Sequence, residues 1–462
     1  MNTIDPQRLK LLMEREQQSY LASHPKSVAL YERAKNSLLA GVPFCFMNGF
    51  MDPSFPLFIA EGRGAYVTDV DGNRYLDLLA GDLGSIFGHS PPAVADAIAQ
   101  QAQRGIMFTL PSEDAIWVGE ELTRRYGLPL WQIHMSASDS VRAAIKISRE
   151  VTQRHLTLMF NGSYHGTVEE TCVAVVDGKM ITHPKAVHFG IGMLPEPESR
   201  TRVVDPYDLD AVERALSPRD VACVITEPTF SQALRGPFDQ DFHIALRDLT
   251  RRYGTKLIID ETHGIGAAWG GCTGLWNLEP DIFVAGKGIA GGMPASVMGL
   301  SQEVADSVMP LFENFFVAGI GSTLSGNALA VAALRANLEH VMTESAYERM
   351  MSAGERMAKG MQEVVTAADL PWRVSRWLGY GVRVGFSLER PRTMAEAQIR
   401  GDEQSYNIRG DELIQYFHAF YVNRGIIILA MALSALNSPA VTAEDVDYYV
   451  GVFGECVNEL IG

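Results

Sequence analysis

A single lysine, Lys287, ends the apolar run DIFVAG and precedes a series of small residues. A buried ammonium group is costly unless it is paired or neutralised, so Lys287 should have a group to bind or to react with. Polar residues also follow three other apolar runs: Asp260 ends TKLIID, Glu227 follows VACVIT, and Tyr164-His165 lies just after HLTLMF. Together these positions offer an amine, carboxylates and an aromatic ring beside an imidazole.

Short apolar runs alternate with helical segments between about residues 110 and 300. Continuous apolar runs are typical of strands buried on both faces, and intervening helices indicate crossovers, so we expect an α/β fold with a largely parallel sheet. Ligands bind at the carboxyl ends of the strands in such sheets. The polar residues that follow each run should therefore meet at one edge of the sheet.

The two ends of the chain read differently. Residues 1–66 are polar and helical in pattern with scattered prolines, and GAYVTDVDGNRYLDLLAG predicts a hairpin around Asp71-Gly72. A long helix from Leu334 to about Val365, the strands GVRVGFSLE and RGIIILAM, and a closing helix after Thr442 indicate an α+β domain. We expect a large domain over residues 67–335 and a small domain over 336–462, with residues 1–66 packing on the small domain.

Composition excludes several classes of protein. The 462 residues carry a net charge of −16, which argues against a nucleic acid partner. The cysteines are scattered without CxxC spacing, so they predict reduced thiols and no metal site: Cys45, Cys172, Cys223, Cys272 and Cys456. The start of the chain lacks a secretory pattern, and no apolar stretch approaches the roughly 20 residues that span a bilayer. We expect a cytoplasmic protein with no membrane partner.

The ordered series of motifs resembles the fold type I enzymes that depend on pyridoxal phosphate. More specifically, it is similar to the class III aminotransferases, the group of the ω-aminotransferases and glutamate-semialdehyde aminomutases. The resemblance covers most of the chain and rests on VTDVDGNRYLDLLAG, GHSPPAV, YHG, ITEP, LIIDE, AGKGIAGGMP and GSTLSGNALA. It implies a mostly parallel, seven-stranded sheet flanked by helices, with a smaller α+β domain built from both chain ends.

The resemblance gives Lys287 and Asp260 the central roles. Lys287 would form a Schiff base with the cofactor, which explains a lysine at the end of a buried run. Asp260 would keep the pyridine nitrogen protonated, because a neighbouring carboxylate favours the charged form. Tyr164 would stack on one face of the ring, and Thr262, where relatives usually carry valine, would lie on the other.

The resemblance also implies a phosphate site. SASDS opens a helix at the position of the family's Ser-Gly-Thr turn, so that Ala137 and Ser138 would present the phosphate-binding groups. Thr323 matches a threonine that in relatives reaches the phosphate of the neighbouring subunit, which implies a homodimer with shared sites. His165 and Glu227 complete the expected cofactor contacts, with Glu227 orienting groups near the ring.

This constellation predicts a transaminase that moves an amino group from an amine or amino acid to a carbonyl acceptor. Lys287, once displaced from the cofactor, would act as the general base that carries the proton between substrate and cofactor carbons. Return of the amine to another carbon of the same molecule would instead make an aminomutase like the glutamate-semialdehyde enzyme. A third, weaker alternative is a fold relative that has lost catalysis.

The chain departs from the family where a substrate carboxylate would bind. From Gly425 onward no arginine occurs, and AGVPFCFMNGF carries none either, although a carboxylate favours a bidentate guanidinium. We therefore expect apolar or aromatic amines as substrates, with Phe44, Phe46 and Met47 lining the pocket.

Simpler interpretations compete at several positions. Lys287 could be a surface lysine, Ser138 a helix N-cap, and Thr323 a turn residue. His263 receives no role from the resemblance, so we expect it to be structural. AGKGIAGG is not a Walker phosphate loop because Gly288 stands where Ser or Thr is needed, and GRGAYV and GIGAAWGG match dinucleotide fingerprints only loosely.

Overall fold

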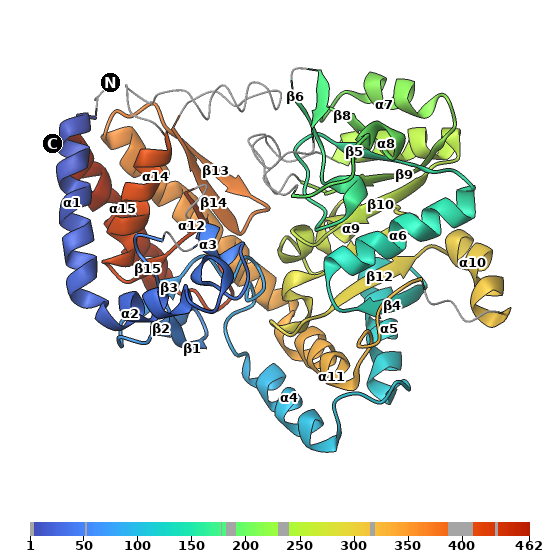
Figure 1. Cartoon of the computed structure of the whole chain (residues 1–462), viewed down its shortest axis with the longest axis horizontal. Coiled ribbons are helices and arrows are strands. Elements are labelled where there is room, and N and C mark those ends of the chain that lie inside the picture. The colour runs from blue at the N-terminus through green and yellow to red at the C-terminus, as the bar shows by residue number, and fades with distance from the viewer. Residues whose placement is uncertain are drawn as a thin grey trace. The chain divides into compact units, whose positions relative to one another are not determined.

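The computed structural model describes residues 4–50, 53–176, 178–181, 191–229, 240–314, 319–386, 410–429 and 433–462. Its contacts divide the chain into two compact units (Figure 1). The first, here called the end unit, contains the described residues up to Pro91 and from Ser345 onward. The second, here called the sheet unit, contains the described residues from Pro92 to Glu344.

The end unit joins both ends of the chain. Its N-terminal elements are α1 (Pro6–Ser23), α2 (Pro25–Ala34), α3 (Met47–Phe50), β1 (Ile59–Arg63), β2 (Tyr66–Asp69) and β3 (Arg74–Asp77). Its C-terminal elements are α12 (Glu344–Ala367), β13 (Arg373–Trp377), β14 (Gly381–Gly385), α14 (Gly410–Val422), β15 (Ile426–Ile427), β16 (Ser434–Leu436) and α15 (Ala443–Ile461). The strand β15 pairs in parallel with β3, which completes a sheet of the order β1-β2-β3-β15.

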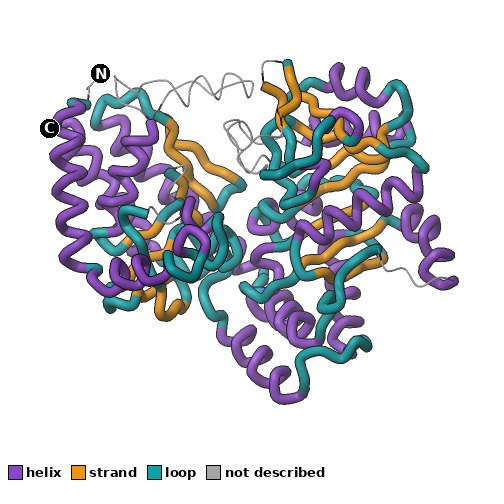
Figure 2. Tube along the Cα trace, viewed as in Figure 1, coloured by secondary structure: helices purple, strands orange, loops and turns teal. Residues whose placement is uncertain are grey.

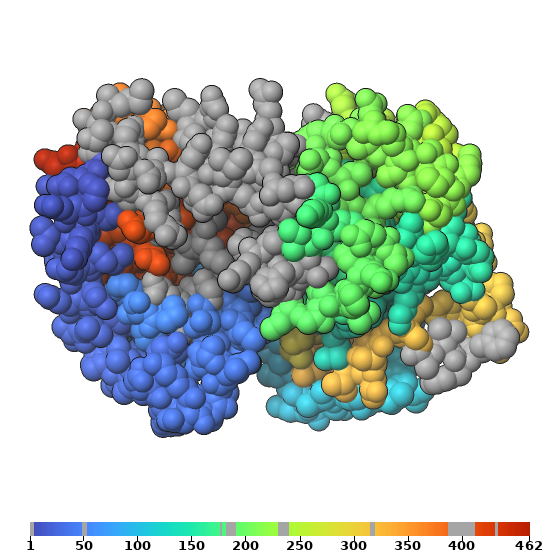
Figure 3. Space-filling view, turned by 45° about the horizontal axis from the view of Figure 1, so that its top comes forward, coloured from blue at the N-terminus to red at the C-terminus, as the bar shows by residue number. Residues whose placement is uncertain are grey.

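Packing within the end unit explains why two distant segments share it. One large apolar core gathers residues from α1, α12, α14 and α15 with strands β3 and β14, and a second, smaller core joins Tyr20 of α1 to Ala419 and Val422 of α14. The Arg8 side chain in α1 donates a hydrogen bond to the backbone oxygen of Glu459 in α15. In the space-filling view, the dark blue N-terminal surface adjoins dark red atoms of the C-terminus (Figure 3).

The sheet unit alternates strands and helices. Its strands are β4 (Leu130–His134), β5 (Leu156–Phe160), β6 (Ala174–Val176), β7 (Lys179–Ile181), β8 (Thr201–Val204), β9 (Val221–Thr226), β10 (Lys256–Asp260), β11 (Ile282–Ala285) and β12 (Ser296–Leu300). Its helices are α4 (Pro92–Arg104), α5 (Glu113–Tyr126), α6 (Ala137–Thr152), α7 (Leu209–Leu216), α8 (Gln240–Tyr253), α9 (Gly271–Leu275), α10 (Gln302–Asn314) and α11 (Ala328–Ala336). Single turns include η4 (Gly264–Gly266), η5 (Lys287–Ala290) and the π-helical η6 (Asn337–Val341).

The central sheet has seven strands in the order β4-β12-β11-β10-β9-β5-β8. All neighbouring pairs from β11 to β8 are parallel, and β12 runs antiparallel to both β11 and β4. The predicted mostly parallel α/β sheet is therefore confirmed. Its parallel strands bring their carboxyl ends to one edge, which is where the polar residues of the sequence motifs lie.

Both faces of this sheet are buried, as the continuous apolar runs predict (Figure 2). Met159, Ile225 and Ile258 face the helices α6 and α10, whereas their neighbours Leu158 and Ile259 face α7 and α8. Successive strand residues thus enter opposite cores, and both cores need apolar side chains.

The expected hairpin is present, because β2 and β3 pair in antiparallel fashion around Asp71-Gly72. The expected single helix over residues 334–365 is wrong. The helix α11 ends at Ala336, the Met342 N–H bonds back to the Asn337 oxygen at 2.8 Å in a π turn, and α12 begins at Glu344. This wide turn interrupts the α-helical hydrogen bonding that continuous apolar periodicity had suggested.

The unit boundaries lie near residues 91 and 345, whereas the sequence suggested 66 and 335. The first lies later because β2 and β3 belong to the sheet that β15 completes. The charged segment ERPRTMAEAQIRGDEQSYNIRG (389–410), whose composition predicts an exposed loop or insertion, lies outside the described residues except at Gly410, where α14 begins. Among the helices of the described ranges, none is long and apolar enough to cross a membrane.

Candidate active site

The strand ends of the sheet unit collect the predicted residues. Asp260 is the last residue of β10 and pairs with Val284 of the neighbouring β11. Lys287 follows β11 after one intervening glycine, and Glu227 follows β9, whose Thr226 pairs with Ile259. Tyr164 and His165 lie on the loop after β5, the strand next to β9. Four neighbouring parallel strands therefore deliver the amine, both carboxylates and the aromatic–imidazole pair to one edge.

Asp260 is a buried carboxylate with two polar partners. His165 bonds to its Oδ2 through Nδ1 at 2.9 Å, and the backbone N–H of Thr262 donates to its Oδ1 at 3.1 Å. Burial by itself raises the pKa of a carboxyl group, but the hydrogen bonds and charge of His165, together with the hydrogen bonds of Thr262, outweigh it. The pKa of Asp260 is lowered as a result, so this group stays ionised in the interior.

A second carboxylate–imidazole contact lies one strand away. Glu227 accepts the backbone N–H of Tyr164 through Oε1 at 3.0 Å, and its Oε2 lies 3.0 Å from Nδ1 of His263. The Tyr164 and His263 rings are tilted, with centroids 6.3 Å apart. Glu227 therefore ties the Tyr164 loop to the segment that follows β10.

Sequence reasoning did not connect His263 with this contact. The residue follows Asp260 by three positions, so its proximity to the site was evident, but no spacing rule pairs it with a glutamate on another strand. A weak signal was available, because an imidazole and a carboxylate at the ends of adjacent parallel strands lie near each other.

Lys287 occupies an unusual backbone conformation. Its φ of 51° lies in the left-handed region, which is uncommon for residues other than glycine, asparagine and aspartate. The residue is partly buried and opens the turn η5. Strained conformations of this kind persist where the surrounding structure holds them, and they concentrate at functional sites.

The N-terminus of α6 lies beside this lysine turn. A Cβ placed on Gly286, the residue before Lys287, would stand 2.9 Å from the Ala137 Cβ and 3.3 Å from its backbone nitrogen. A Cβ on Gly166 would clash with the Ser138 Oγ at 2.2 Å, and Gly166 also has a φ of +80°. Glycines at these two positions allow the start of α6 to approach both the lysine turn and the loop after Tyr164.

The interpretation of Ser138 as the N-cap of this helix is wrong. The cap of α6 is Ser136, whose hydroxyl accepts the Asp139 N–H at 3.2 Å. The Ser138 hydroxyl instead accepts the backbone N–H of Thr167 at 3.0 Å. Within the described residues, the N–H groups of Ala137 and Ser138 donate no backbone hydrogen bond, as is usual for the first turn of a helix.

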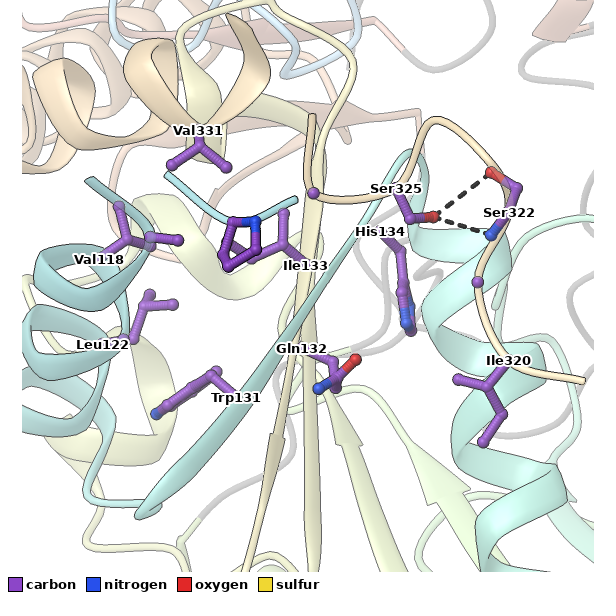
Figure 4. Close-up of a pocket in the computed structure, with 15 residues that line it drawn as sticks. Val118, Leu122, Trp131, Gln132, Ile133, His134, Ile320, Ser322, Ser325 and Val331 are labelled. Atoms are coloured by element: carbon purple, nitrogen blue, oxygen red, sulfur yellow. Dashed lines mark hydrogen bonds between the residues drawn. The ribbon is translucent and has the colours of Figure 1, made fainter. Parts of the chain in front are cut away.

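A pocket of about 280 Å³ lies in the sheet unit between β4 and the segment that contains Ser322 and Ser325 (Figure 4). His134 lines it, and a buried chain leads from this ring to α6: His134 Nδ1 to Ser140 Oγ at 3.0 Å, Ser140 to Ser296 at 2.8 Å, and Ser296 to the Ser136 oxygen at 2.7 Å. The Ser136 carbonyl can only accept, so Ser296 donates to it and Ser140 donates to Ser296. Ser140 must then accept from His134, which places the ring proton of His134 on Nδ1. No predicted site residue lines the pocket.

Three groups of expected residues lie elsewhere. Thr323 is exposed in the single chain, and the neighbouring Ser322 hydroxyl contacts the sulfur of Met135, which directly follows β4, at 3.3 Å. Phe44 and Met47 are exposed residues of the end unit, where the Phe44 and Phe46 rings lie 6.0 Å apart. Their contribution to a substrate pocket stays a prediction. All five cysteines are free thiols, and four of them are buried.

The cluster can bind an anionic aromatic molecule that carries a reactive carbonyl group. A buried ionised carboxylate can hold a cationic ring nitrogen, the free N–H groups of a helix N-terminus suit a phosphate, and a lysine between them can condense with an aldehyde. This set of donors matches the functional groups of pyridoxal phosphate.

Comparisons with known proteins agree with that chemistry. The chain matches the family model "Aminotransferase class-III" over residues 50–444. A solved structure of a glutamate-1-semialdehyde aminomutase from Pseudomonas aeruginosa, in complex with PMP, is similar with a TM-score of 0.90 and 38% identity, over 99% of this chain and 100% of that one. An omega-transaminase structure from Sphaerobacter thermophilus is similar with a TM-score of 0.82 and 26% identity, over 96% of this chain and all of that one.

A curated relative, the glutamate-1-semialdehyde 2,1-aminomutase of Thermus thermophilus, is 31% identical over 94% of this chain and 99% of its own length. These findings show the family, the fold type I architecture and the cofactor. The chain belongs to the class III aminotransferases and is a pyridoxal-phosphate-dependent enzyme.

Proposed function

We propose that this enzyme moves an amino group between neighbouring carbons of one small substrate, as a 2,1-aminomutase. The relatives from Thermus thermophilus and Pseudomonas aeruginosa that carry this name match nearly the full length of the chain. The omega-transaminase neighbour is less similar in sequence. The aminomutase alternative is thus better supported than the intermolecular transaminase that the sequence analysis put first.

In this proposal, the residues at the strand ends bind and orient the cofactor. The N–H groups of Ala137 and Ser138 bind its phosphate, and Asp260 accepts a hydrogen bond from its protonated ring nitrogen. Tyr164 and Thr262 bound the two faces of the ring. When bound, pyridoxal phosphate supplies a carbonyl carbon that receives the amino group and a ring that withdraws electrons from the bond that breaks.

Lys287 holds the cofactor in the resting enzyme and carries the proton during turnover. Once displaced from the cofactor, its amine would accept the proton from the substrate carbon and return it to the cofactor carbon. The ionised state of Asp260 is required throughout, because a neutral partner would let the ring nitrogen lose its proton. The single observation that carries the proposed chemistry is the buried Asp260, bonded to His165, on the strand next to the one that delivers Lys287.

An isomerisation is balanced without a second substrate. The amino group and the carbonyl oxygen exchange carbons, so substrate and product have the same composition. The test uses glutamate 1-semialdehyde as the only substrate of the holoenzyme. We expect many turnovers per active site to the isomeric amino ketone with no added amine or carbonyl acceptor.

Two results would overturn this assignment. Turnover that requires an added carbonyl acceptor would identify a transaminase. The lack of arginine from Gly425 onward would then favour apolar or aromatic amines as its substrates. No turnover with either class of substrate, although the cofactor is bound at Lys287, would identify a non-catalytic relative.

We further propose a homodimer in which Thr323 completes the phosphate site of the partner. Thr323 is exposed, and the sheet unit also exposes the apolar side chains of Leu324, Phe108 and Leu110. Co-expressed subunits of Lys287→Ala and Thr323→Ala provide the test. A shared site predicts that the mixed dimer regains one intact site and therefore activity. If Thr323 acts within its own subunit, mixing restores nothing.

A further inference from the structure

The turn that follows Lys287 depends on a side chain from a distant part of the sheet unit. Lys287 opens the short turn η5 with a φ of 51°. Within this turn, the Ile289 N–H donates to the Gly286 oxygen at 3.2 Å and the Gly291 N–H donates to the Gly288 oxygen at 3.1 Å. Such a short turn leaves backbone carbonyls that need further partners, because it lies in a buried region.

Asn337 supplies those partners. Its side-chain nitrogen donates to the backbone oxygens of Gly288 at 2.9 Å and Ile289 at 2.8 Å. Both amide hydrogens are therefore used, and the side chain is fully buried. The orientation of the amide is determined, because a flipped amide would place Oδ1 against two carbonyl oxygens.

The backbone that presents Asn337 is itself held in place. Asn337 begins the π turn η6, which closes with the Met342 N–H at 2.8 Å from the Asn337 oxygen. The buried Arg125 guanidinium donates to the oxygens of Leu338 and Met342 and bonds to Glu121 at 2.6 Å. Wide turns of this type recur at functional sites, where they direct a side chain that a regular helix would place elsewhere.

We propose that Asn337 is a positioning residue for Lys287. By bonding to the two carbonyls that follow Lys287, it keeps the lysine in the left-handed conformation from which the side chain enters the site. Without these bonds, the buried Ile289 carbonyl loses the donor that Asn337 supplies and the Gly288 carbonyl keeps only the N–H of Gly291. The turn can then relax away from the left-handed conformation, which is unfavourable for a residue with a side chain. The inference rests on the proposed role of Lys287 as the residue that binds the cofactor.

The test replaces Asn337 and a matched asparagine in the other unit. Asn337→Leu keeps the approximate volume and removes both donors without adding a charge. Asn437→Leu is the control, because Asn437 is equally buried, also donates to a backbone carbonyl, that of Tyr380 at 2.8 Å, and its Oδ1 likewise has no partner among the described residues. Both variants should lower the melting temperature.

The readout is the rate at which borohydride traps the cofactor on Lys287, measured by mass spectrometry of that peptide in folded holoenzyme. We expect trapping to be about tenfold slower in Asn337→Leu, because the turn would no longer be held in the left-handed conformation that presents Lys287. The control should trap like wild type. Asn337→Ser, which keeps one donor but is too short to reach both carbonyls, should be intermediate and serves if the leucine variant does not fold.

Two failures can be told apart. If wild-type Lys287 is not trapped at all, the proposed role of the lysine is wrong. If wild type is trapped and the Asn337 variants match both wild type and the Asn437 control, Asn337 is merely structural and the inference is overturned.

Discussion

Two neighbouring carboxyl groups at the end of β10 have pKa values shifted in opposite directions. Asp260 and Glu261 are both buried, yet the pKa of Asp260 lies below its ordinary value whereas burial raises the pKa of Glu261 to about 7. Asp260 lies on the side of the strand end that meets His165. Glu261 lies on the opposite side, against the segment from Gly264 to Thr273.

Their partners explain the difference. Asp260 has an imidazole on one oxygen and a backbone N–H on the other. Glu261 accepts two hydrogen bonds from Thr273 on Oε1, whereas its Oε2 has no partner among the described residues. A Cβ on Gly264 would stand 1.9 Å from that Oε2, so this oxygen packs directly against backbone.

The comparison shows that burial alone does not decide the charge of a carboxyl group. Burial disfavours the ionised form of both residues, and only at Asp260 do the contacts with His165 and Thr262 outweigh it. Asp260, with its lowered pKa, is suited to hold a cationic ring, whereas Glu261, which is only partly ionised near neutral pH, is suited to hold a turn.

Replacement of Asp260 should have the largest effect of the changes considered. Asp260→Asn keeps the shape and removes the charge, so we expect activity to fall about 10²–10³-fold, the usual cost of removing one electrostatic contact to the reacting group. The measurement is kcat/KM at neutral pH. Glu261→Gln is the control, and an equal loss in both variants would show that the two carboxyls do not differ in role.

Glu261 should make stability depend on pH. Its pKa is higher in the folded protein than the ordinary 4.5, so its contribution is complete below pH 4.5 and is lost as the pH rises through about 7. A shift of this size corresponds to about 3 kcal/mol.

The matching experiment compares melting temperatures of wild type and Glu261→Gln from pH 5 to 8. Wild type should lose stability relative to the variant across this range. Parallel curves would mean that Glu261 is ionised like its neighbour. The pKa of Asp260 is lowered by folding, so its contribution to the stability of the protein is present at neutral pH and is lost only as the pH falls into the acid range.

His165 should affect activity through Asp260. His165→Leu removes the hydrogen bond that keeps the carboxylate ionised, and a bond to a charged group is worth about 1.5–3 kcal/mol. We expect cofactor affinity to fall about 10–100-fold, measured by equilibrium dialysis. His165→Asn can still donate from a similar position and should recover much of the loss, whereas equal effects of both variants would point to packing.

Thr273 should have the smallest effect. Thr273→Val removes the hydroxyl that donates to Glu261 at 2.7 Å and leaves the backbone donor in place. We expect about 1 kcal/mol of destabilisation by urea unfolding at neutral pH, where Glu261 is partly ionised, and less at pH 5. An effect that does not change with pH would separate Thr273 from the ionisation of Glu261.

Much of the site was predictable because its residues end buried strands. Lys287, Asp260 and Glu227 follow apolar runs, and parallel strands bring their ends together whatever the helices between them contain. The roles that the resemblance assigns to these residues stay predictions that the experiments above test.

Other features were not predictable from local patterns. The periodicity of residues 334–365 suggested one helix, but tertiary hydrogen bonds to Arg125 accompany a π turn at Asn337. His263 looked structural by itself, and its contact with Glu227 joins two strands that are separated by a whole helix.

The sequence by itself determined the sheet, the order of its motifs and the family, because apolar periodicity and strand-end residues are local properties of the chain. Only the tertiary structure decided that the pKa of Asp260 is lowered, that the pKa of Glu261 is raised and that Asn337 bonds to the lysine turn. Those outcomes depend on which donors lie within hydrogen-bond distance of a buried group, and the donors come from remote parts of the sequence.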